Sequence, residues 1–149
     1  MGPPIRILVI DDDEDIRKIL VAVLEKEGYK VDTAKNGKEA IEKSRKNFYN
    51  MSLVDVKLPD MEGIRLLTRI KDTTPKMVKI IITGYPSLQN AIGAVNQGAD
   101  SFIVKPFKME SILQTIKKCL KKQQEAKEYS QKKVTEFIQT RAIELEAAS

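Results

Sequence analysis

The chain has 149 residues, of which 42% are hydrophobic, and it carries 26 Lys and Arg against 21 Asp and Glu. This length suits one domain with a core and a small appendage, and excludes a second full domain. One cysteine and no histidine exclude a disulfide framework, a cysteine zinc site, imidazole metal ligands and histidine-based acid–base catalysis. The formal charge of +5 is spread over the whole chain, so it does not by itself indicate nucleic-acid binding.

Short apolar or β-branched runs alternate with longer segments of helical spacing. This alternation predicts repeated βα units around a parallel sheet, and a sheet covered on both sides explains why ILVI, and the three isoleucines of KIII, are continuously apolar. Gly28 is the predicted end of the first helix, whose apolar face holds Ile16, Ile19, Leu20, Val23 and Leu24. In chain order we predict strands near 5–10, 30–34, 51–55, 78–83 and 101–104, and helices around 14–27, 37–47, 62–72 and 87–97.

The last segment has no Pro or Gly from Met109 onward, so the final helix is predicted to run to about residue 145. Its first apolar stripe should dock on the domain and consists of Ile112, Leu113, Ile116 and Leu120. The second stripe consists of Val134, Phe137, Ile138, Arg141, Ala142 and Leu145. We expect this distal stripe to mediate self-association or partner binding, and a solvated linker helix is the alternative.

Polar side chains stand at four of the five predicted strand ends. They are Asp11 with Asp12, then Asp55, Thr83 and Lys105. In an open parallel sheet the ligand site lies beyond the carboxyl ends of the strands, so these side chains can converge. Neighbouring carboxylates about 5 Å apart repel by roughly 3 kcal/mol per pair at an effective dielectric constant near 20, and a hard cation such as Mg²⁺ would relieve that repulsion.

Thr83 as a hydroxyl donor and Lys105 as a compact cation suit the oxygens of a phosphoryl group. Taken singly, each of these residues also has an ordinary structural explanation. Acids at 11–15 can cap a helix, Asp55 can be a turn residue, and Thr and Lys are common on surfaces. Their joint placement at adjacent strand ends favours a functional site.

Four segments, ILVIDDDEDIRKIL, SLVDVKLPDMEG, IIITGYPS and GADSFIVKPF, occur in an order and spacing that resemble the CheY-like receiver domain of two-component response regulators. The resemblance covers residues 5–120 and leaves 121–149 as a helical extension. It implies an α/β, flavodoxin-like, doubly wound (βα)5 fold with a five-stranded parallel sheet in the order 2-1-3-4-5. It also implies a signalling domain that catalyses its own phosphorylation and dephosphorylation, and not a turnover enzyme.

Residue by residue, the resemblance implies that Asp55 is the phosphoryl acceptor. Asp12 would bind Mg²⁺ directly, Asp11 largely through water, and the backbone carbonyl of Lys57 would be a further ligand. Asp13 would be accessory.

The remaining implied roles concern the switch. Thr83 would bond a phosphoryl oxygen, Lys105 would pair with the phosphoryl group, and Phe102 would be the aromatic switch residue. The Lys105–Pro106 peptide bond would be cis. Tyr85 and Lys57 occupy positions that tune the lifetime of the phosphoryl group.

The resemblance implies a sensor histidine kinase or a phosphotransfer protein as donor, and a downstream protein partner of unknown identity. The responding face would combine the helix at 87–97, strand 101–104 and the helix after Phe107. Because no apolar run is long enough to cross a bilayer and no signal peptide follows Met1, we expect a cytoplasmic protein without membrane contact.

Two other readings stay open. A haloacid-dehalogenase-like phosphatase would use Asp11 as nucleophile and Asp13 as acid–base, but it needs an acidic pair downstream of Lys105 that this sequence lacks. The chain could also be the receiver part of a truncated DNA-binding transcription regulator. Residues 121–149 are too few for a helix-turn-helix domain, so we do not expect this chain itself to bind DNA.

Overall fold

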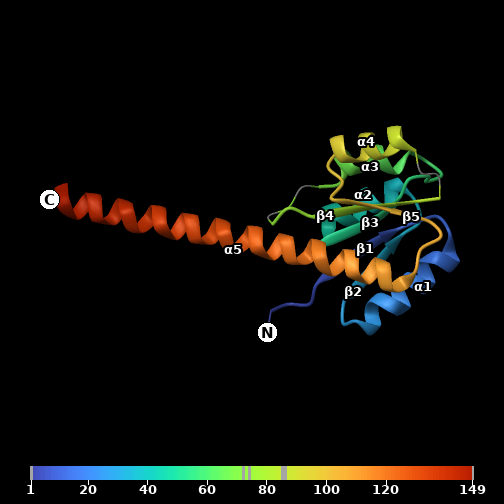
Figure 1. Cartoon of the computed structure of the whole chain (residues 1–149), viewed down its shortest axis with the longest axis horizontal. Helices are drawn as coiled ribbons and strands as arrows, with labels where there is room; N and C mark the ends of the chain where they lie inside the picture. The colour runs from blue at the N-terminus through green and yellow to red at the C-terminus, as the bar shows by residue number, and fades with distance from the viewer. Residues whose placement is uncertain (1, 72, 74, 85–86, 149) are drawn as a thin grey trace.

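The fold is a five-stranded parallel sheet in the order β2-β1-β3-β4-β5, shown in Figure 1. The computed structural model describes residues 2–71, 73, 75–84 and 87–148. The sheet confirms the predicted fold class and strand order. Its strands are β1 (Arg6–Ile10), β2 (Lys30–Ala34), β3 (Met51–Asp55), β4 (Val78–Thr83) and β5 (Ser101–Val104).

Helices cover both faces of the sheet (Figure 1). One core lies under α2, α3 and α4, and the other lies under α1 and the first part of α5. Along β1, Leu8 and Ile10 enter the first core while Ile7 and Val9 enter the second. This double burial is why the strand is continuously apolar. The helices are α1 (Glu14–Lys26), α2 (Gly37–Lys46), α3 (Gly63–Arg69), α4 (Leu88–Asn96) and α5 (Met109–Ala148).

Helix α1 begins and ends where its sequence predicts. The side chain of Asp13 caps its first turn, and Gly28 just beyond its end has a φ of 93°, a conformation that favours glycine. Leu20 and Leu24 are buried, as predicted, but Ile19 is 50% exposed. The prediction for Ile19 was wrong because the buried face centres on Leu20 and Leu24, and Ile19 points well to one side of it.

Helix α5 is longer than the domain it packs on. Ile112 and Ile116 are buried and Leu113 and Leu120 pack around them, as predicted. The contact continues beyond residue 120, because Gln123 Nε2 donates to the carbonyl oxygens of Asn50 at 2.9 Å and of Lys76 at 2.8 Å. Residues 124–148 are all exposed, and this part of α5 projects away from the sheet (Figure 1).

No helix in the part of the chain that the structure describes has the length and apolar character required to span a membrane.

Candidate functional site

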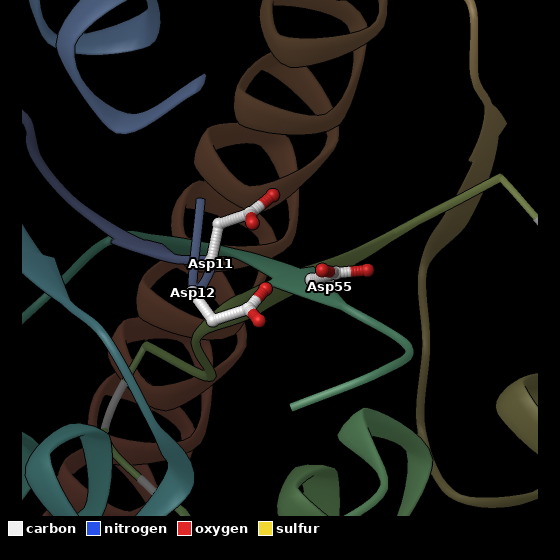
Figure 2. A group of neighbouring side chains, drawn as sticks. All are labelled: Asp11, Asp12 and Asp55. Carbon is white, nitrogen blue, oxygen red and sulfur yellow. The ribbon is translucent and has the colours of Figure 1, made fainter. Parts of the chain in front are cut away.

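Three carboxylates meet at the carboxyl edge of the sheet. Asp11 and Asp12 directly follow β1, and Asp55 is the last residue of the neighbouring strand β3 (Figure 2). One oxygen atom from each carboxylate lies within 4.8 Å of the others. The sequence therefore predicted this convergence correctly, from the rule that parallel strands place their carboxyl ends at one edge.

Asp11 is held in place from two sides. Its side chain is nearly inaccessible, with the residue 3% exposed, and its Oδ1 accepts the Asp13 N–H at 2.9 Å. Its carbonyl oxygen accepts a hydrogen bond from Arg17 Nη1 at 2.7 Å. Arg17 was not predicted as a site residue. The sequence signal for its role is weak: it is a basic residue near the start of the helix that follows the two acids.

Lys105 is the cation nearest the acids. Its Nζ lies 3.3 Å from Asp11 Oδ2 and 3.8 Å from Asp55 Oδ2. Burial, followed by the negative charge of Asp11, raises the pKa of Asp55 to about 6, although the Lys105 ammonium acts in the opposite direction. One ammonium therefore does not offset the burial and mutual repulsion of these acids.

The donor set fits Mg²⁺. All three side chains offer oxygen, and Asp12 is exposed, so a cation could keep water ligands there. The acids border an open cleft of 490 Å³ lined by Asp12, Asp55, Lys57, Gly84 and Lys105. Burial and the charge of Asp11 raise the pKa of Asp55, so a bound cation would stabilise its ionised form. The structure thus places Lys57 in the lining of the cleft, and the role of its backbone carbonyl as a metal ligand stays a prediction.

Thr83 and Phe102 come from two further strands of the sheet: β4, which pairs with β3, and β5, which pairs with β4 on its other side. Thr83 ends β4 and is fully buried, and its carbonyl oxygen accepts the Lys105 N–H at 2.7 Å. Phe102, in β5, is partly buried against the core under α2, α3 and α4. The Lys105–Pro106 peptide bond is cis, as predicted. Tyr85, which was predicted to tune phosphoryl lifetime, lies outside the described residues.

Gly63 sets the path of the chain behind Asp55. Its N–H donates to the Val56 carbonyl oxygen at 2.7 Å. A Cβ atom at residue 63 would overlap the carbonyl oxygen of Asp55 and lie 2.8 Å from its carbonyl carbon. Only glycine fits this close backbone approach. This role was not predicted from the sequence, and the signal for it is a glycine at the start of the helix that follows Asp55.

Asp13 serves as a helix cap. Its Oδ1 accepts the N–H groups of Asp15 at 2.9 Å and Ile16 at 3.3 Å. Within the described residues, the group of three carboxylates able to hold a cation is Asp11, Asp12 and Asp55. This arrangement does not favour the phosphatase reading, which requires Asp13 as an acid–base catalyst.

Comparison of the sequence with known proteins identifies the family of the chain. The family model described as response regulator receiver domain matches residues 7–117. The chain is 36% identical over 116 residues to the transcriptional regulatory protein ZraR of Escherichia coli (strain K12), which covers 78% of this chain and 26% of ZraR. It is 31% identical over 141 residues to the transcriptional regulatory protein SrrA of Staphylococcus aureus (strain NCTC 8325 / PS 47), which covers 94% of this chain and 58% of SrrA.

The fold is likewise similar to a solved structure. A CheY-like response regulator receiver domain protein from Methanospirillum hungatei JF-1 matches with a TM-score of 0.80 and 41% identity, covering 83% of this chain and 99% of that one. The chain belongs to the response regulator receiver domain family of two-component signal transduction. It spans about a quarter of the length of ZraR and 58% of SrrA. Phosphorylation and Mg²⁺ binding at an acidic pocket are typical of the family.

Proposed function

We propose that Asp55 accepts a phosphoryl group from the phosphohistidine of a sensor histidine kinase or phosphotransfer protein, in a cytoplasmic reaction that requires Mg²⁺. The observation that supports this most directly is the cluster of Asp11, Asp12 and Asp55, with carboxylate oxygens within 4.8 Å of one another. Lys105 Nζ lies 3.8 Å from Asp55 Oδ2. From there its ammonium group could form an ion pair with an oxygen of a phosphoryl group on Asp55.

In this reaction the Asp55 carboxylate attacks phosphorus, a P–O bond forms, and the P–N bond to the donor imidazole breaks. Asp11, Asp12, Asp55 and the Lys57 carbonyl would hold Mg²⁺, which would supply positive charge to neutralise the phosphoryl oxygens. Lys105 pairs with one of those oxygens, and the hydroxyl of Thr83 donates to another. The chain would thereby catalyse its own phosphorylation. In dephosphorylation water would attack the phosphorus, the bond from phosphorus to the Asp55 oxygen would break, and inorganic phosphate would leave with the Asp55 carboxylate restored.

Intact-mass measurement tests the proposal. We expect wild-type protein incubated with acetyl phosphate and Mg²⁺ to gain the mass of one phosphoryl group. Asp55→Asn should gain none, because an amide oxygen is a poor nucleophile, and wild type in excess EDTA should label at least about 10-fold more slowly. Asp13→Asn, which alters a neighbouring acid that caps α1, is the matched control and should label like wild type. Equal labelling of wild type and Asp55→Asn would refute the assignment.

The signal would leave through α4, β5 and the start of α5. This face displays apolar side chains, since Ile92 is 51%, Val95 66% and Val104 43% exposed. Phosphorylation would draw the Thr83 hydroxyl toward the phosphoryl group, and Phe102 would turn inward behind it. The phosphoryl group provides the differential interaction that such a population shift requires.

NMR can test this coupling. We expect Thr83→Ala to be phosphorylated but to lose most of the phosphate-dependent shift changes of residues in β5 and α4. Thr83→Ser keeps the hydroxyl and should retain them. If Thr83→Ala showed the wild-type shift changes on that face, Thr83 would not couple the two sites.

The distal part of α5 would serve output by pairing with a second copy. Phe137 is 70%, Ile138 60%, Val134 58% and Leu145 58% exposed, and they lie at spacings of three and four on one helix face. Residues 109–148 form one continuous helix, so this segment holds no helix-turn-helix. ZraR and SrrA are named transcriptional regulatory proteins, and we propose that this chain would act in such a pathway through protein contacts.

Sedimentation of point variants tests the pairing. We expect the full chain to self-associate and Phe137→Glu to weaken association about 10-fold or more, because a charge would enter an apolar seam. Ile143 is 67% exposed but lies on the opposite side of the helix from the stripe. Ile143→Glu should therefore associate like wild type. A full chain that is monomeric with and without phosphoryl group would exclude homodimerisation.

A further inference from the structure

The loop between β3 and α3 is attached to the start of α2 by Asp60. Asp60 Oδ1 accepts the Gly37 N–H at 2.8 Å, and Oδ2 accepts the Lys38 N–H at 2.9 Å. These donors belong to the first turn of α2, where backbone N–H groups lack helical acceptors. Both carboxylate oxygens are therefore engaged. Backbone hydrogen bonds, of which the one from Gly37 has the largest effect, lower the pKa of Asp60.

The loop is short and closed on itself. Lys57 pairs with Glu62 in an antiparallel bridge, and the Leu58 N–H donates to the Met61 carbonyl oxygen at 3.3 Å. Asp60 thus stands at the tip of a loop whose base begins two residues after Asp55. The bridge and this hydrogen bond hold the two sides of the loop together. Fixing Asp60 at the tip therefore restricts the backbone of Lys57 at the base.

A second contact holds the same tip. The side chain of Met61 covers Gly37 so closely that a Cβ atom at residue 37 would lie 2.5 Å from Met61 Sδ. A hydrogen-bonded pair and an apolar contact therefore join the loop to α2 at adjacent residues. Asn36 caps the same helix by accepting the Glu39 N–H at 2.8 Å, but it lies outside the loop.

We propose that Asp60 is a positioning residue for the metal centre, which anchors the loop to α2 and thereby fixes the backbone carbonyl of Lys57 beside Asp55. The inference rests on the proposed function, because it takes the Lys57 carbonyl as a ligand of Mg²⁺. It adds α2, a helix that contributes no side chain to the acid cluster, to the support of the site. Residues that orient metal ligands commonly change metal affinity 10-fold to 100-fold when they are replaced.

Two variants separate positioning from helix capping. Asp60→Ala removes the anchor, and Asn36→Ala removes a cap of the same helix without touching the loop. In the metal-free full chain, we expect Asp60→Ala to accelerate hydrogen exchange of the Leu58 amide, and Asn36→Ala to leave it unchanged. In NMR titrations with Mg²⁺, Asp60→Ala should raise the dissociation constant about 10-fold, and Asn36→Ala less than about 2-fold.

The outcomes distinguish the two proposals. If wild type binds Mg²⁺ and the two alanine variants bind it equally well, the positioning role of Asp60 is overturned while the proposed function stands. If wild type shows no shift changes with Mg²⁺, both proposals fall. Asp60→Glu offers a further check, since a longer carboxylate should restore part of the Leu58 protection if the anchor is a charged hydrogen-bond acceptor.

Discussion

Replacing Gly63 with alanine is expected to lower the free energy of unfolding by about 3 kcal/mol, at the upper end of the range for overpacking. The new Cβ atom would overlap the carbonyl oxygen of Asp55 and lie 2.8 Å from its carbonyl carbon. These are backbone atoms at the end of a central strand, which cannot give way as a flexible side chain can. Relief therefore requires α3 to move, which would break the 2.7 Å hydrogen bond from Gly63 to Val56 and displace the acceptor.

A second glycine provides the control. Gly93 lies within α4, and a Cβ atom there would meet Ile64 side-chain atoms at an ordinary 3.9 Å. Gly93→Ala is expected to leave stability unchanged or to raise it by up to about 1 kcal/mol, because alanine favours a helix interior. Urea unfolding of wild type and both variants makes the comparison. Equal midpoints for Gly63→Ala and Gly93→Ala would show that the backbone approach at Gly63 is not tight.

The second large effect is a loss of stability as the pH rises in metal-free protein. The pKa of Asp55 is raised from 3.8 to about 6, first by burial and then by Asp11. Between these values the folded state binds more protons than the unfolded state, so stability falls as the pH rises through the folded pKa. This contribution is fully present below about pH 4 and lost above about pH 6, and it amounts to about 3 kcal/mol.

Urea unfolding in EDTA at several pH values measures this loss. Other acids titrate in the same range, so the informative quantity is the difference between wild type and Asp55→Asn. We expect Asp55→Asn to become more stable relative to wild type as the pH rises, because an amide cannot acquire charge. Saturating Mg²⁺ should abolish the decline in wild type by stabilising the ionised carboxylates. Parallel curves for the two proteins without metal would contradict this account.

The strands and the acid cluster were predictable from local patterns. Continuous apolar runs such as that of β1 are the signature of strands buried on both faces, and their ends fix where Asp11, Asp12 and Asp55 lie. The length of α5 followed from the lack of Pro and Gly after Met109. Each of these inferences uses residues adjacent in sequence together with a general rule of sheet geometry.

The contacts that support the site could not be predicted in this way. The hydrogen bonds of Asp60 with α2, and those of Gln123 with Asn50 and Lys76, join residues 22 to 73 positions apart. Their existence depends on distances between packed elements, which composition and periodicity do not specify. The prediction that Ile19 lies on the buried face of α1 was wrong for a related reason. Spacing defines the direction of an apolar face only to within about a quarter of a helix turn.

Chemical trapping of the phosphorylated residue tests the central claim most directly. Borohydride reduces an aspartyl phosphate to homoserine, and peptide mass spectrometry then locates the converted residue. After treatment with acetyl phosphate and Mg²⁺, we predict homoserine at residue 55 and unmodified aspartate at residues 11, 12 and 13. Homoserine at residue 11 with aspartate intact at residue 55 would contradict the account and support a phosphatase-like nucleophile at the end of β1.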